Sequence, residues 1–383
     1  MTVGEVVMRI KGKFAFLVFA FLVLTALASV SEARTIYVPD DYMKIQWAVD
    51  NASDGDTIIV RDGTYSENID VNKRLTIKSE NGSAKTIVQA ANPDDYVFEV
   101  TADYVNISGF TAGFGLFGAD YCNISDNNVR SLRIENANHN KISKNNISSG
   151  ILIDGWANLI LNNNISVSFC GGGYGGISLF GSYNEIIGNF FFSGSIPGEG
   201  VAWKCSASYN VIKDNTFKNC GVIAFNGFPQ TVENNTVNGK PLVCLWGSSN
   251  STVENAGQVI IIKCKNVTVK GLNLSYAPVG VELYESENCR IENNTFISNN
   301  QNVAIVKSHN NTIANNNMRT EEVNIGLQWL LNVVFKCGSA TNNTIINNVI
   351  KGDIGIKPYV ESCYNRISMN YIECFYPLPH PLR

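Results

Sequence analysis

Acidic side chains with arginines between them are the residues of this sequence best placed to do chemistry. They lie between positions 103 and 154, and comprise Asp103, Asp120, Asp126, Arg130, Arg133, Glu135 and Asp154. Gathered on one face, such residues could hold Ca²⁺ while a basic group takes a proton from an acidic polysaccharide. The same composition is more often an ordinary solvated face.

Glu135 and Asp154 are the catalytic candidates, with Arg133 as the basic residue beside them. Glycoside hydrolysis needs two carboxyl groups about 5–10 Å apart, and adjacent repeats of the chain would supply that spacing. Any two acidic residues on stacked repeats meet the same criterion. An enzyme, either a lyase or a glycoside hydrolase, is therefore the alternative hypothesis, and Ca²⁺ is the one cofactor it would require.

The element that must position these residues is a repeat of the form Asn-x-Ile-x-x-Asn-x-(Ile/Val/Phe), which returns about every 22 residues. Clear copies begin at Asn140, Asn158, Asn184, Asn210, Asn343 and Asn365. Short alternating segments between Gly and Asn corners predict short strands with one buried face. We expect an all-β fold, a single-stranded right-handed parallel β-helix of about a dozen coils, with the asparagines in corners and ladders.

The ends of the chain differ from the repeats. Residues 1–33 combine basic residues, an apolar run and a small residue at Ala33, which predicts a secretory signal peptide or an uncleaved anchor. Residues 34–95 are expected to form an N-terminal cap, with one short helix, and the first coils. Residues 96–375 carry the repeats, and residues 376–383 form a C-terminal tail that prolines exclude from a strand ladder.

Composition further limits the classes of function that the chain could have. The net charge is −4 and charged residues make up 16 % of the chain, so nothing indicates nucleic-acid binding. In an exported chain the ten cysteines can form disulfides, and Cys244/Cys264 and Cys363/Cys374 are close enough along the coil to pair. About thirteen Asn-x-Ser/Thr sequons indicate a glycoprotein.

Short motifs resemble known families. Ile45-Gln46-x-Ala48-Val49, with Gly55-Asp56-Thr57-Ile58 and the Gly63–Asn68 segment, resembles the N-terminal cap of pectin-lyase-like β-helices. The Asn-rich coils, with Asn238–Leu242 and Gly257–Ile260, resemble β-helix proteins of the NosD and carbohydrate-binding (CASH, PbH1-repeat) type. The resemblance implies a protein of an archaeal or bacterial surface. It specifies the fold and not the activity.

The resemblance to NosD also raises copper-enzyme maturation as a third hypothesis. The histidines are His139, His309 and His380, and the cysteines contain no CxxC pair. A soft metal site usually needs a tighter group of ligands than this sequence offers. We therefore expect no metal site.

A column of outward residues on the Gly-(Ile/Val)-x-Leu-x strand is the candidate ligand-binding site. If Ile177 and Leu179 face inward, the next residue of each rung faces outward. Aromatic rings at rung spacing on a rigid sheet would stack on sugar rings. Two alternatives stay open, namely loops that cover this face and an interface with another envelope protein. The column consists of Phe180, Lys204, Phe225, Trp246, Lys263 and Tyr284.

These observations favour an exported cell-envelope protein, secreted or held at the cell surface, that binds a polysaccharide or serves a structural role. Its expected partners are glycans and other envelope proteins. It would contact the membrane only through an uncleaved N-terminal segment.

Overall fold

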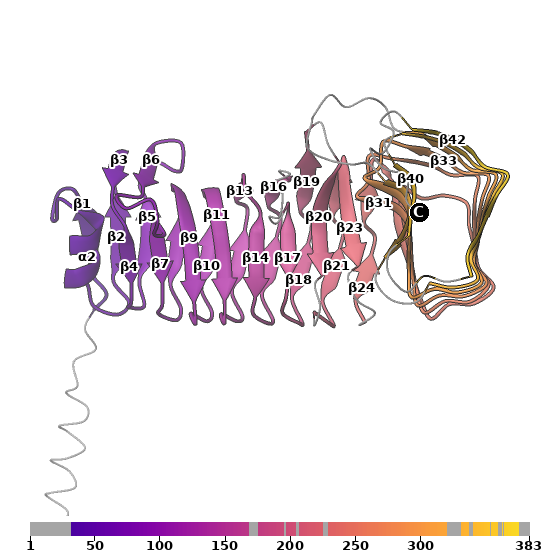
Figure 1. The fold of residues 1–383 in the computed structure, drawn as a ribbon. Coiled ribbons are helices and arrows are strands. Elements are labelled where there is room, and N and C mark those ends of the chain that lie inside the picture. Colours follow the sequence, from indigo (N-terminus) through magenta and orange to yellow (C-terminus); the bar gives the residue numbers. More distant parts are fainter. Residues whose placement is uncertain are drawn as a thin grey trace, which may run out of the picture.

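The computed structural model describes residues 32–167, 175–194, 197–203, 207–224, 229–319, 331–336, 340–352, 354–358, 362 and 364–374. Parallel strands stack in rungs along this part of the chain, and one short helix, α2 (Ile45–Asn51), closes the N-terminal end (Figure 1). The predicted parallel β-solenoid with an N-terminal capping helix is therefore confirmed. In the described residues no helix is both long and apolar enough to cross a membrane. Residues 1–31 of the predicted signal segment, and the predicted tail, lie outside them.

The first stack has three strand faces. One face is a ten-stranded parallel sheet of β1 (Thr35–Val38), β2 (Thr57–Val60), β5 (Thr76–Ser79), β8 (Asn106–Ser108), β10 (Asn123–Ser125), β12 (Lys141–Ser143), β15 (Leu159–Leu161), β18 (Glu185–Ile187), β21 (Val211–Lys213) and β24 (Thr231–Glu233). The second face contains β3 (Gly63–Ser66), β6 (Thr86–Gln89), β13 (Asn146–Ile147), β16 (Asn164–Val167), β19 (Phe190–Ser193), β22 (Thr216–Lys218) and β25 (Thr236–Val237). The third contains β4 (Ile69–Val71), β7 (Phe98–Val100), β14 (Ile151–Asp154), β17 (Ile177–Leu179), β20 (Gly198–Trp203) and β23 (Cys220–Ala224), while β9 (Thr111–Phe117) and β11 (Asn128–Glu135) belong to both.

The repeat isoleucines build the core because their positions are in register from rung to rung. Ile124, Ile142, Ile160, Ile186 and Ile212 pair in sequence along the ten-stranded sheet, and all are fully buried. Burying an Ile side chain contributes about 1.5–3 kcal/mol. Each rung alone has too little core to fold, so the stack is stabilised by its neighbours.

The predicted asparagine ladders are present. Along one corner the side-chain oxygen of each buried asparagine accepts a hydrogen bond from the backbone N–H of the asparagine on the preceding rung. Asn189 Oδ1, for example, accepts from Asn163 N at 2.8 Å. The series runs through Asn127, Asn145, Asn163, Asn189, Asn215 and Asn235. A second corner carries Asn140, Asn158, Asn184 and Asn210, which ends on Gln230. These side chains satisfy backbone groups that the turn at each corner leaves buried.

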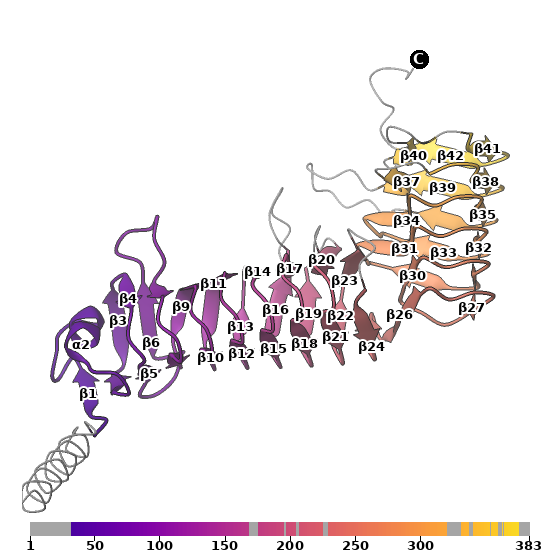
Figure 2. The ribbon, with the colours of Figure 1, turned by 90° about the horizontal axis from the view of Figure 1, so that it is seen from below.

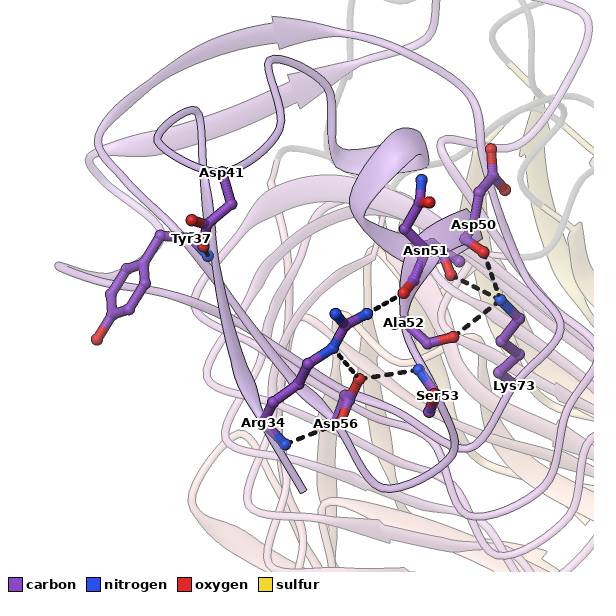
Figure 3. A network of polar contacts seen from close by, with 10 residues as sticks. Arg34, Tyr37, Asp41, Asp50, Asn51, Ala52, Ser53, Asp56 and Lys73 are labelled. Atoms are coloured by element: carbon purple, nitrogen blue, oxygen red, sulfur yellow. Dashed lines mark hydrogen bonds and ion pairs between the residues drawn. The ribbon is translucent and has the colours of Figure 1, made fainter. Parts of the chain in front are cut away.

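The N-terminal cap is held by charged side chains on backbone groups (Figure 3). Asp56 is buried and accepts hydrogen bonds of 2.8 Å from the backbone N–H groups of Arg34 and Ser53 and from Arg34 Nε. Lys73 Nζ donates to the carbonyls of Val49, Asp50 and Ala52 at the C-terminal end of α2. The last carbonyls of a helix lack the N–H donors that a further turn would supply, and the ammonium group of Lys73 donates to them instead.

The solenoid changes direction at Asn238 and Gly239. Both residues have positive φ, 50° and 79°, and join β25 to β26 (Lys240–Trp246) in an antiparallel pair, as an Asn-Gly turn favours. The following rungs form a second stack whose axis crosses that of the first (Figure 2). Its strands are β26, β28 (Gln258–Ile262), β31 (Val279–Tyr284), β34 (Gln301–Val306), β37 (Leu331–Lys336) and β40 (Ile354–Pro358); β27 (Thr252–Val253), β29 (Thr268–Lys270), β32 (Arg290–Glu292), β35 (Thr312–Ala314), β38 (Thr344–Ile346) and β41 (Arg366–Ser368); and β30 (Asn273–Ser275), β33 (Thr295–Ile297), β36 (Asn317–Arg319), β39 (Val349–Gly352) and β42 (Tyr371–Cys374).

The outer face of the second stack closes the end of the first. Gln258 Oε1 accepts from Val222 N at 3.0 Å and its Nε2 donates to Val222 O at 2.6 Å, while Glu282 Oε2 accepts from Ala224 N at 3.1 Å. The two side chains thus bond the backbone of β23, as the next parallel strand would if the first stack continued. Ile260 and Ile262 point the same way and belong to the hydrophobic core of the first stack. An open solenoid end would expose both core and backbone, and this packing covers them.

The expected Cys244/Cys264 disulfide is wrong, because both thiols are free. Cys244 packs against the core of the first stack, whereas Cys264 is buried in the core of the second. The two side chains thus belong to different cores. Burial raises the pKa of the Cys244 thiol to about 12, which keeps it protonated and unreactive. Cys363 lies outside the described residues.

Candidate functional site

The predicted outward column does not form one exposed platform. Tyr284 is only 6 % exposed, because this part of the column lies in the junction between the two stacks. Trp246 is half-buried there, with Lys263 Nζ 5.3 Å from its ring centroid. Phe180 is half-buried after β17, and its N–H donates to Ile153 O. Lys204 and Phe225 lie outside the described residues.

The prediction that Lys263 pairs with the other residues of the outward column is wrong by one residue. The residue that pairs with both Trp246 and Tyr284 is Ile262. Lys263 occupies the corner after the strand with a φ of 53°, and its Nζ lies 3.8 Å from a carboxylate oxygen of Glu285. The lysine is therefore part of a charged corner and not of the aromatic column.

Exposed aromatic rings instead gather at a corner of the first stack, before the strands β8 to β21 of the ten-stranded sheet; each lies two residues before its strand, except Trp156, which lies three before β15. We call this row the aromatic corner, and it consists of Tyr104, Tyr121, His139, Trp156, Tyr183 and Tyr209. All but Trp156 have φ between 55° and 60°, and at its rung the neighbouring Ala157 takes that conformation. Tyr104, Tyr121, Trp156, Tyr183 and Tyr209 are each about half exposed, at 49, 49, 52, 59 and 55 %.

Most rings of the aromatic corner stack face to face along the solenoid axis. Tyr104 and Tyr121 are 5.0 Å apart at 7°, Tyr121 and His139 are 4.9 Å apart at 4°, and Tyr183 and Tyr209 are 5.3 Å apart at 14°. The guanidinium of Arg74 lies over the other face of Tyr104, 5.5 Å from its centroid. The faces of Tyr104 and Tyr121 are therefore occupied within the stack, and these rings present mainly their edges to solvent.

Trp156 is oriented differently from the rest. Its ring centroid is 5.0 Å from that of His139, close to the rung spacing of about 4.8 Å, so the two rings are displaced along the axis. Their planes meet at 70°, and the indole therefore turns its edge to His139 and its faces sideways. Hydrogen bonds fix the backbone on both sides, from Trp156 N to Asn138 Oδ1 and from His139 N to Trp156 O. Trp156 is 52 % exposed, so part of its indole is open to solvent.

The carboxylates predicted as catalytic lie at the ends of the strands β11 and β14, which lead toward this corner. Glu135 and Asp154 are register partners on adjacent rungs, which places them about 4.8 Å apart along the axis. Asp154 is exposed and precedes Trp156 by two residues. Arg133 Nη2 lies 2.7 Å from Glu135 Oε2. The structure thus brings together the three predicted residues, and sequence reasoning missed the tryptophan two residues after Asp154.

A second acidic group lies nearby on the same outer face. Glu99 pairs with Asp70 on the preceding rung and with Gly115 on the next, and Gly115 pairs with Arg133. Burial raises the pKa of the Glu99 carboxyl, and the charges of Asp95 and Asp70 add to the effect. Above Gly115 lie the rings of Tyr96 and Phe117, which meet edge to face at 5.3 Å. Only glycine fits under them, since a Cβ there would be 2.4 Å from the Phe117 ring.

The described residues contain no group of three or more His, Cys, Asp or Glu side chains that could hold a metal ion. His139 stacks on Tyr121 in the first stack, while His309 Nδ1 contacts Thr341 Oγ1 at 2.8 Å in the second. The two imidazoles are thus held in separate stacks, and His380 lies outside the described residues.

Comparisons with known proteins agree with the fold. Residues 230–374 match the family described as periplasmic copper-binding protein (NosD), and residues 101–256 match the right-handed β-helix region family. A cell surface glycoprotein of Methanothermus fervidus is 36 % identical over 129 residues, which are 33 % of this chain and 21 % of that protein. This chain therefore matches only about a fifth of its relative's length.

Solved structures are similar to this chain at low sequence identity and low TM-score. The surface adhesin PfbA of Streptococcus pneumoniae has 11 % identity and a TM-score of 0.38, with 86 % of this chain and 93 % of that chain covered. An alginate lyase of Paenibacillus sp. has 16 % identity and a TM-score of 0.28, with coverages of 89 % and 99 %. The two family matches agree with the stacked parallel rungs of a β-helix, and a third of the chain is similar to a cell surface glycoprotein.

Proposed function

We propose that this protein is an exported surface protein that binds carbohydrate through the aromatic corner, with Trp156 as its principal contact. The observation that carries the proposal is the half-exposed indole of Trp156, turned edge-on to His139, at the corner to which the strands of Glu135 and Asp154 lead. The relationship to a cell surface glycoprotein supports the location at the cell surface.

The chemistry of Trp156 and its neighbours suits a sugar. One face of a pyranose carries C–H groups that pack on an aromatic ring, while its hydroxyl groups need hydrogen-bond acceptors at the rim. Asp154 and Glu135, on the strands that lead to this corner, supply such acceptors. The rigid rungs hold these groups in place before the ligand arrives, so little entropy is lost on binding.

The test is a glycan array followed by titration of each hit with the full chain and three variants. Trp156→Ala is expected to weaken binding at least about tenfold, equivalent to about 1.4 kcal/mol. Tyr121→Ala should weaken it less, because the faces of that ring are already covered. Trp47→Ala is the matched control, since Trp47 is 48 % exposed but lies on the capping helix with Lys44 over its ring. Equal affinity of the Trp156→Ala and Trp47→Ala variants, or no binding to any glycan, would refute the proposal.

A polysaccharide lyase or hydrolase is the second candidate. The register pairing of Glu135 with Asp154, and the raised pKa of Glu99 on the same face, favour it. A raised pKa makes a carboxyl group a better candidate for a general acid. Each glycan that binds should therefore be assayed for new reducing ends and for unsaturated products. Product that disappears in Glu135→Gln or Asp154→Asn would replace the binding function by an enzymatic one.

A further inference from the structure

The sequon asparagines and the ladder asparagines are different sets of residues. Every described ladder asparagine is buried or half-buried, and none of them begins an Asn-x-Ser/Thr sequon. Every described sequon asparagine is exposed, except Asn123, which is half-buried. The two sets even adjoin, as in Asn310-Asn311-Thr312, where Asn310 is exposed and Asn311 is 1 % exposed. The repeat itself separates them, because the second residue after a repeat asparagine is an inward apolar residue and not Ser or Thr.

In the second stack four sequon asparagines and one further asparagine line up along one corner. We call this row the asparagine column, and it consists of Asn250, Asn266, Asn288, Asn310 and Asn342. Each lies two residues before its strand and all five have φ between 55° and 57°. The first four donate their backbone N–H to the next rung. The side chains therefore project to solvent from successive rungs, about 4.8 Å apart. Asn266 Nδ2 reaches Asn250 Oδ1 at 3.1 Å, which confirms that neighbouring side chains lie side by side.

The second requirement of a sequon is met by a matching column of hydroxyl groups. Thr252 pairs with Thr268, and Thr312 pairs with Thr344, on the strands that follow the corner. Between them lies Arg290, so Asn288 is the one member of the column without a sequon hydroxyl. The chain thus contains its own negative control within a single, regular geometry.

We propose that the asparagine column is a row of N-glycosylation sites at Asn250, Asn266, Asn310 and Asn342. Glycosylation forms a bond from Asn Nδ2 to C1 of a sugar. It breaks the C1–O bond of a lipid-phosphate-linked oligosaccharide, the lipid phosphate leaves with the bonding electrons, and Nδ2 releases one proton. The column suits the reaction because it presents each amide on an exposed corner, clear of the sheet. The resulting row of glycans would cover one edge of the second stack.

The proposal is tested by glycopeptide mass spectrometry on the full chain, purified from its native source. Glycans are expected on the four sequon asparagines of the column and not on Asn288. Thr252→Ala, Thr268→Ala, Thr312→Ala and Thr344→Ala should each remove the glycan of one site only, while the asparagine itself stays. Folding of each variant is checked by its far-ultraviolet circular dichroism, because these threonines are at least partly exposed and their loss should leave the rungs intact.

A gain of modification is the sharper test. Arg290→Thr places a hydroxyl in register with Thr268 and Thr312 and should add a glycan at Asn288. Arg290 is exposed and its ion pair is with Glu292 on the same strand, so the fold does not depend on it. An unmodified Asn288 in this variant, or bare asparagines at the four sites in the native chain, would overturn the proposal.

Discussion

Removal of a single ladder amide should destabilise the whole solenoid, and Asn189 is the position to test. Its Nδ2 donates to Ile160 O at 2.8 Å, and its Oδ1 accepts from Asn163 N at 2.8 Å. The residue is 1 % exposed. In Asn189→Ala both backbone groups lose this partner in a place where water does not reach. Each buried group left unsatisfied costs about 1–3 kcal/mol, so we expect a loss of about 2–6 kcal/mol.

The matched control is Asn164→Ala, one residue after the ladder asparagine Asn163. Asn164 is exposed, and its amide only donates to Asn146 Oδ1 on the solvent side. Its removal should change the free energy of unfolding by less than about 0.5 kcal/mol. The loss expected for Asn189→Ala is a large part of the about 5–15 kcal/mol that stabilises a typical domain.

Urea denaturation followed by circular dichroism gives the free energies, and amide hydrogen exchange gives their location. In Asn189→Ala, exchange should accelerate first at the N–H of Asn163, on the neighbouring rung. If the two variants unfold within about 0.5 kcal/mol of each other, the ladder amides do not carry the structural role assigned to them.

The remaining predictions concern the cap and the junction. Burial raises the pKa of Asp56, but the hydrogen bonds from Ser53 and Arg34 outweigh it and hold that pKa below its usual range. The stability that this carboxylate contributes is present above its unfolded pKa of about 3.9 and is lost as pH falls through the lower folded value. The melting temperatures of wild type and Asp56→Asn should therefore differ at pH 7 and converge by about pH 2, and a constant gap would contradict this assignment. Gln258→Leu should cost about 2–6 kcal/mol in urea denaturation, because Val222 N and O lose their partner at the junction; a cost below about 1 kcal/mol would mean that the second stack does not close the first.

The core and the ladders could be predicted from the sequence because packing repeats them at fixed intervals. Inward isoleucines and corner asparagines recur at the same offset in each rung, so one pattern predicts many positions. The pairing of Glu135 with Asp154 follows from the same regularity. Such a prediction fails only where the rungs themselves change direction.

The outward column failed for that reason. Asn238-Gly239 reverses the chain between the two stacks, and a repeat count alone does not detect a change of axis. A local signal was present in the run Val259–Ile262, which lacks the polar alternation of a strand with one solvated face. A strand that is apolar at consecutive positions is buried on both faces. Ile260 and Ile262 are indeed fully buried against the first stack.

The aromatic corner had a sequence signal too, since Tyr104, Tyr121, His139, Tyr183 and Tyr209 all lie three residues before a core isoleucine. The pattern is visible once the corner is recognised as a position with its own column. What sequence could not supply is the orientation of Trp156. That orientation depends on the neighbouring Ala157, which takes the corner conformation in its place.

The choice of residue at this corner separates scaffold from surface function. The left-handed conformation costs a bulky residue about 1–2 kcal/mol, whereas asparagine tolerates it well. The second stack builds the same corner with asparagine at every rung from Asn250 to Asn342. The first stack uses tyrosine instead, at Tyr104, Tyr121, Tyr183 and Tyr209, and ring stacking of about 0.5–1.5 kcal/mol per pair offsets only part of that cost. Because asparagine serves the fold at a lower cost, the tyrosines of the first stack agree with the carbohydrate-binding role proposed above, which the Trp156→Ala variant tests.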